Sequence, residues 1–116
     1  MRTRRRRPRG EDTVTTSREV LDGAPVTVVV AWDSGWMLIS ASEESTSEPI
    51  AVHFHTLSDA DPSLHSLSLR EGQYAVRGTD LSNWVIHGPL SFDEIDTALE
   101  SGEVVDEVIA LSRTSD

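Results

Sequence analysis

The chain contains no cysteine and no lysine. The absence of cysteine excludes disulfide bonds, thiolate metal ligands and cysteine nucleophiles. The absence of lysine excludes the phosphate-binding loop of P-loop enzymes, which places a lysine after its glycines. Ser34 is not framed by a G-x-S-x-G sequence, so the strained turn that exposes a hydrolase serine is missing as well. We therefore expect a protein that is not an enzyme and that holds no cofactor.

Long apolar segments are also lacking. None approaches the roughly 20 residues that a bilayer-spanning helix needs. The basic amino terminus is not followed by an apolar stretch, as it would be in a secretory signal. We therefore expect no membrane partner and a cytoplasmic location.

Positive charge is scarce outside the amino terminus. Ten arginines oppose 20 acidic residues, which gives a net charge of −10, and six of the arginines lie in the first ten residues. The other 106 residues hold four basic and 20 acidic side chains, a net charge of −16. We predict a disordered arginine-rich tail over residues 1–11 and a single domain over residues 12–116. An acidic domain repels nucleic acid and attracts basic protein surfaces, although acidity also serves solubility alone.

The apolar residues are arranged mostly in short segments typical of β-strands. Residues 26–32 are β-branched and apolar on both faces, which predicts a central strand. A turn at Asp33-Ser34-Gly35 then predicts a hairpin to a strand at 36–39. Further strands are predicted at 13–16, 73–77 and 83–87.

Helix signals lie between and after these strands. Ser91 and Glu94 have the spacing of a capping box, and Gly102 can end the helix that they begin. An apolar stripe from Val104 to Ile109 predicts a second helix. Earlier helical turns are predicted at 17–22, from a capping box of Thr16 and Glu19, and after Asp61-Pro62. The fold expected is α+β, a single small domain with a mainly antiparallel β-sheet and two or three short helices.

Residues 50–57 fit either an alternating strand or a helix. On a strand, His53 and His55 would share one face and could both bind a metal ion, completed by Asp59, His65 or His87. Cupins use such a His-x-His pair, but the glycines that frame the cupin motif are absent here. The alternative is a pair of solvent-facing histidines or a histidine in the core, and no metal is expected.

The three tryptophans are the other residues of note. Trp32 and Trp36 flank the Asp33-Ser34-Gly35 turn, and Trp84 lies on a later strand. Packing in the core is the usual role of tryptophan in a small domain. The alternative is that one of them is an exposed anchor for a binding partner.

The turn Asp33-Ser34-Gly35-Trp36, between two apolar strands, resembles a family of small bacterial proteins. That family was first catalogued as a domain of unknown function and then regrouped as polymorphic-toxin immunity proteins. Residues 15–23 resemble its opening strand and turn, residues 59–64 resemble its Asp-Pro-Ser segment, and the resemblance covers residues 13–77. It implies a protein that binds and neutralises a cognate toxin domain in the cytosol.

The predicted partner is therefore another protein with a basic surface, and nucleic acid is not expected to bind. The predicted contact residues are those of the turn and of the acidic loop that follows it: Asp33, Ser34, Trp36, Glu43, Glu44 and Glu48. Two alternatives stay open. One is a structural or regulatory interaction domain without a toxin partner, and the other is a small metal-binding protein that uses His53 and His55.

Overall fold

Six strands form one sheet in the computed structural model, which describes residues 12–32, 35–40, 49–79 and 83–113. Their order is β4-β1-β3-β2-β5-β6, and of the neighbouring pairs only β1 and β3 run parallel. The strands are β1 (Thr13–Thr16), β2 (Val28–Trp32), β3 (Gly35–Ile39), β4 (Ile50–His53), β5 (Tyr74–Val76) and β6 (Val85–His87). The predicted α+β fold with a mainly antiparallel sheet is confirmed. The predicted tail, residues 1–11, lies outside the described residues.

Strand β2 is the centre of this sheet, as its composition predicts. It pairs with β3 on one side and with β5 on the other. Val28, Val29 and Val30 are all fully buried. Successive side chains of a strand point to opposite faces, so burial of all three requires that both faces of the sheet are covered.

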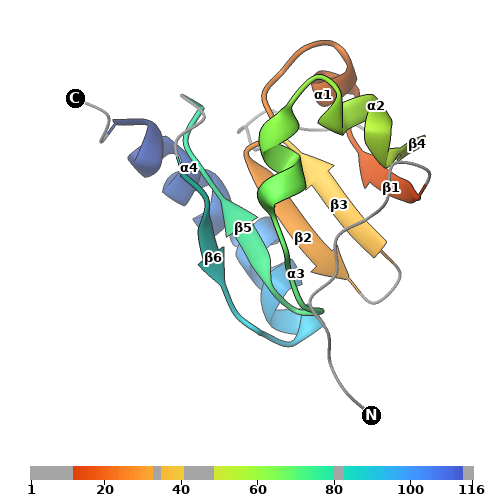
Figure 1. The fold of residues 1–116 in the computed structure, drawn as a ribbon. Coiled ribbons are helices and arrows are strands. Elements are labelled where there is room, and N and C mark those ends of the chain that lie inside the picture. Colours follow the sequence, from red (N-terminus) through yellow and green to blue (C-terminus); the bar gives the residue numbers. More distant parts are fainter. Residues whose placement is uncertain (1–11, 33–34, 41–48, 80–82, 114–116) are drawn as a thin grey trace.

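Two groups of helices cover these faces, one on each side (Figure 1). Helices α3 (Phe92–Ser101) and α4 (Glu103–Arg113) pack on the face that presents Val28 and Val30. The short helices α1 (Arg18–Leu21), α2 (Phe54–Ser58) and η1 (Pro62–Ser66) lie over the other face, which presents Val29. The protein therefore has two hydrophobic cores, separated by the sheet.

The local signals at the two carboxyl-terminal helices are confirmed. The Ser91 hydroxyl accepts a hydrogen bond from the Glu94 amide, and the Glu94 carboxylate accepts one from the Ser91 amide, both at 3.2 Å. Gly102, with φ +87°, ends α3 and lets α4 begin at the next residue. The capping box and Gly102 thus fix the start of α3 and the boundary between α3 and α4, and with them the positions of the acidic residues on both helices.

Replacing Ser91 with alanine is expected to lower the free energy of unfolding by about 1 kcal/mol, because it removes the acceptor for the first turn of α3. Urea denaturation measures this loss. Thr97→Ala is the matched control, since it removes an exposed hydroxyl from the middle of the same helix, where alanine is favoured. Equal stability of Ser91→Ala and the parent would contradict the capping role.

The helical turn at 17–22 is present as α1, but the capping box predicted for it is wrong. Thr16 is the last residue of β1, and its hydroxyl donates to the Leu38 carbonyl at 2.7 Å across the parallel β1–β3 pair. The N-cap is Ser17, whose side chain makes no capping bond. Residues 50–57 combine both alternatives, because β4 ends at His53 and α2 begins at Phe54.

Candidate protein-interaction surface

The structure places only one of the predicted partner contacts. Asp33, Ser34, Glu43, Glu44 and Glu48 lie outside the described residues, so that part of the prediction stays a prediction.

Trp36, on β3, is 6% exposed, and its ring packs edge-to-face against Phe54 with centroids 6.4 Å apart. A ring buried in this way offers no surface to a partner. The prediction of Trp36 as a contact residue is therefore corrected, and its role is core packing.

The other two tryptophans also pack against the cores. Trp32 is half-buried and meets Phe92 edge-to-face, with centroids 5.4 Å apart. The guanidinium of Arg77 lies 4.1 Å from the centroid of the Trp84 ring. The structure thus favours the core alternative for all three tryptophans over an exposed anchor.

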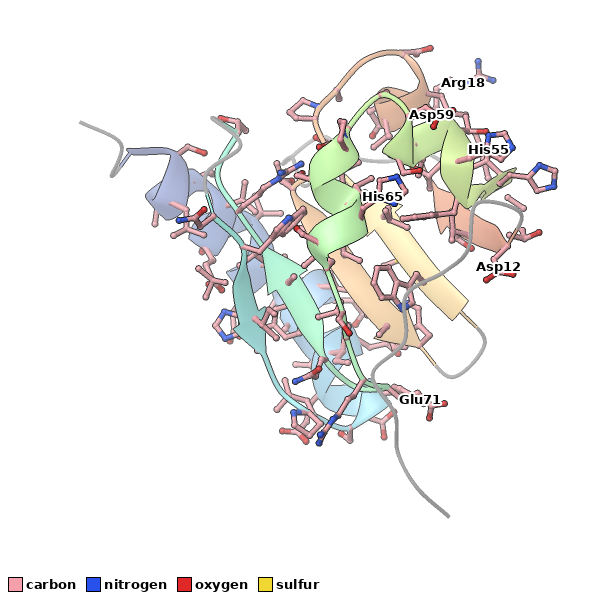
Figure 2. All side chains as sticks on the ribbon, viewed as in Figure 1. Asp12, Arg18, His55, Asp59, His65 and Glu71 are labelled. Atoms are coloured by element: carbon pink, nitrogen blue, oxygen red, sulfur yellow. The ribbon has the colours of Figure 1, made fainter. Side chains whose placement is uncertain are left out.

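His53 and His55 do lie together, although not on one strand. His53 ends β4 and His55 belongs to α2, and their exposed rings are 5.5 Å apart. No group of three or more histidine and carboxylate side chains suited to a metal ion occurs among the described residues. Of the predicted additional ligands, His65 packs its ring against Phe54, and His87 contacts Glu107 on α4. Figure 2 shows His55 on α2, Asp59 directly after α2 and His65 on η1.

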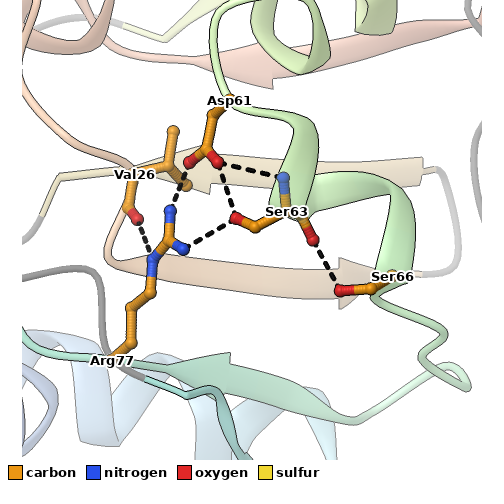
Figure 3. A network of polar contacts seen from close by, with 5 residues as sticks. All are labelled: Val26, Asp61, Ser63, Ser66 and Arg77. Atoms are coloured by element: carbon orange, nitrogen blue, oxygen red, sulfur yellow. Dashed lines mark hydrogen bonds and ion pairs between the residues drawn. The ribbon is translucent and has the colours of Figure 1, made fainter.

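A buried ion pair that the sequence analysis missed connects β5 to η1. Arg77 is 1% exposed and forms an ion pair with Asp61. Its Nε donates to the Val26 carbonyl at 2.9 Å, and a guanidinium nitrogen donates to the Ser63 hydroxyl at 2.8 Å (Figure 3). Asp61 also accepts from the Ser63 amide as the N-cap of η1. All four groups satisfy one another, so this network is structural.

The outer surface of α3 and α4 is strongly acidic. Between residues 92 and 112 the sequence has no lysine, arginine or histidine. The apolar side of each helix, with Ile95 on α3 and Val104 and Val108 on α4, faces the sheet. The acidic residues are Asp93, Glu94, Asp96, Glu100, Glu103, Asp106 and Glu107, and all but Glu107 are exposed. These seven residues are called the acidic helical face below.

Little within the described residues neutralises the acidic helical face. Glu107 pairs with His87, with 2.6 Å between Oε2 and Nε2. None of the other six carboxylates forms an ion pair with a described residue. Unpaired like charges on adjacent helices repel one another, and a cationic partner would relieve that repulsion.

A cleft of about 370 Å³ opens where β5 meets the beginnings of α3 and α4. Tyr74, on β5, is 8% exposed and stacks on His87 with ring centroids 5.0 Å apart. The cleft is lined by Tyr74, Leu90, Asp93, Glu94, Thr97, Ala98 and Glu103. It is called the Tyr74 cleft below, and it joins the acidic helical face to the sheet.

A larger hollow of about 540 Å³ lies on the other side of the sheet, between α1 and α2. Its lining is mostly apolar, with Val20, Leu21 and Leu57 among its residues. The single carboxylate in its lining, Asp61, is already paired with Arg77. The Tyr74 cleft is therefore the better candidate for recognition of a charged group.

Burial raises the pKa of the Tyr74 phenol above its ordinary value, and the negative charges of Glu107 and Glu103 raise it further. The folded protein thus holds the phenolic proton more tightly than the unfolded chain does. Stability is consequently unaffected by this group below about pH 10, and it falls as the pH rises above that value.

Alkaline titration of the tyrosine absorbance is expected to give a midpoint above pH 10, which is the ordinary pKa of about 10 shifted by these causes. The signal is unambiguous because the chain has one tyrosine. Glu103→Gln should lower the midpoint, whereas Glu100→Gln, a control that removes the same charge outside the cleft lining, should leave it in place. A midpoint at or below the ordinary value would contradict the arrangement.

None of the protein family models, curated proteins or solved structures compared with this chain matches it. The resemblance to immunity proteins is thus neither supported nor opposed by these comparisons. No helix among the described residues has the length and apolar character needed to cross a membrane.

Proposed function

We propose that the protein is a protein-binding module, an immunity protein that neutralises a cognate toxin domain in the cytosol by covering a basic surface of that toxin. The observation that carries this proposal is the acidic helical face, with six exposed carboxylates that have no cationic partner among the described residues. The resemblance of residues 13–77 to immunity proteins supports the inhibitory role.

The negative charge of the acidic helical face would favour binding to a positively charged partner. A toxin domain that handles nucleic acid presents a basic surface, and opposite charges accelerate encounter and fix orientation. The carboxylates stand on two helices that are anchored to the sheet by Ile95, Val104 and Val108, so the surface is rigid before it meets a partner. A preorganised surface loses less conformational entropy on binding.

Co-expression with the toxins encoded beside this gene tests the proposal. We expect the protein to restore growth against one of them and to copurify with that toxin domain. Failure to restore growth or to form a complex with any of them would contradict the proposal.

Two matched variants locate the surface. The helix-face variant replaces Asp96, Glu100 and Asp106 with their amides, all exposed and all outside the Tyr74 cleft. The distal variant replaces three exposed carboxylates away from α3 and α4, namely Asp12, Asp22 and Asp59. Each loses three negative charges. Only the helix-face variant should protect less well than the parent, and equal protection by both would exclude this surface.

A further inference from the structure

Tyr74 brings a phenolic hydroxyl to the lining of the Tyr74 cleft. The residue is 8% exposed, and no hydrogen bond joins its hydroxyl to another described residue. The hydroxyl is not among the buried side-chain atoms of the described residues that lack a partner, so it is open to solvent. Because Tyr74 lines an open cleft, its hydroxyl is available to a ligand that enters there.

The lining of the cleft includes both carboxylates and apolar side chains. Asp93 and Glu103 have no ion-pair partner among the described residues, whereas Glu94 already accepts a hydrogen bond from the Ser91 amide. Leu90 and Ala98 add an apolar wall. The Glu107 carboxylate already contacts the His87 ring, with 2.6 Å between Oε2 and Nε2, which leaves Asp93 and Glu103 as the carboxylates available to a ligand.

We infer that the Tyr74 cleft binds the side chain of one arginine from the protein partner. A guanidinium is planar and has five N–H donors, so it can bond the Tyr74 hydroxyl and the two carboxylates at the same time. Its aliphatic stem would lie along Leu90 and Ala98. The inference rests on the proposed function, because it takes the partner to be a protein with a basic surface.

Other cations fit the cleft less well. A lysine ammonium offers three donors from one point and has no planar group to span separate acceptors. A divalent metal ion needs several ligands around one position, and the described residues contain no such group of three or more. The volume of about 370 Å³ is at the lower end of ligand sites, which suits one side chain rather than a folded segment.

Nuclear magnetic resonance of the Tyr74 ring tests the inference in the full-length protein, because the chain has no other tyrosine. The probe is N-acetyl-arginine methylamide, compared with the matched citrulline compound, in which a neutral urea replaces the guanidinium. We expect the arginine compound to shift the ring signals in a saturable way at low ionic strength, and the citrulline compound to leave them in place.

Two variants supply the controls. Glu103→Gln should raise the dissociation constant of the arginine compound about fivefold, whereas Glu100→Gln, outside the cleft lining, should change it less than about twofold. Equal shifts with arginine and citrulline, no saturable shift, or equal effects of the two variants would overturn the inference.

The arginines of this chain are the other source of a guanidinium. The experiment is therefore repeated on a full-length variant in which the six arginines of residues 2–9 are glutamine. If the ring signal of the parent already lies at the bound position and moves away only in this variant, the occupant is the chain's own amino terminus, and assignment to a partner is overturned. Since no toxin is present, failure of this test is distinct from failure to protect cells.

Discussion

Replacing Arg77 with methionine is expected to lower the free energy of unfolding by about 3–5 kcal/mol, the usual cost of removing one partner from a buried ion pair. The side chain is 1% exposed, so its polar contacts are made within the protein and not with solvent. The change removes the cation that pairs with the Asp61 carboxylate and the donor to the Ser63 hydroxyl and the Val26 carbonyl. Urea denaturation followed by tryptophan fluorescence measures the effect.

Arg70 supplies the matched control for Arg77. It is exposed, and its side chain makes no ion pair among the described residues, so Arg70→Met should change stability by less than about 0.5 kcal/mol. Adding Asp61→Asn to Arg77→Met should recover part of the loss, because an uncompensated carboxylate is then removed. A loss below 1 kcal/mol for Arg77→Met, or one equal to that of Arg70→Met, would show that the network does not hold η1 to β5.

Replacing Trp36 with alanine is expected to cost about 3–5 kcal/mol, since the loss of a buried aromatic ring leaves a cavity. The ring is 6% exposed and fills the core between β3 and Phe54. The same denaturation measurement applies.

The control for Trp36 is Leu21→Ala, because Leu21 is 40% exposed. That change should cost less than about 1 kcal/mol, because the Leu21 side chain is partly in water already. A Trp36→Ala protein as stable as the parent would mean that the ring is a surface group. The original assignment of Trp36 to the partner contact would then be restored.

Elements specified by neighbouring residues could be predicted from the sequence. The apolar run of β2, the capping box of Ser91 and Glu94, and the Asp61-Pro62 start of η1 each depend on a few adjacent positions. These signals were sufficient for the α+β class because each strand or helix is short and bounded by its own turn. The capping box of Thr16 failed because Thr16 belongs to β1, where its hydroxyl donates to Leu38, 22 residues away, and the N-cap position falls on Ser17.

The candidate site depends on contacts of a longer range, which local patterns do not encode. Tyr74 and Glu103 line the same cleft because β5 packs against α4, 27 or more residues later in the chain. No local pattern around Arg77 predicts its burial. The side chain is buried in the fold, where it pairs with Asp61, 16 residues earlier. Composition predicted an acidic domain, but the predicted contact residues lie between residues 33 and 48, whereas the structure gathers six exposed carboxylates without an ion-pair partner among the described residues on α3 and α4.

The rate of association between this protein and the toxin domain recovered by co-expression tests the central claim most directly. At low salt, the helix-face variant should associate several-fold more slowly than the parent, and its rate should depend less on salt, because rim charges act on encounter. The distal variant should keep the rate of the parent. Equal association rates and equal salt dependence for the two variants would contradict binding through the acidic helical face.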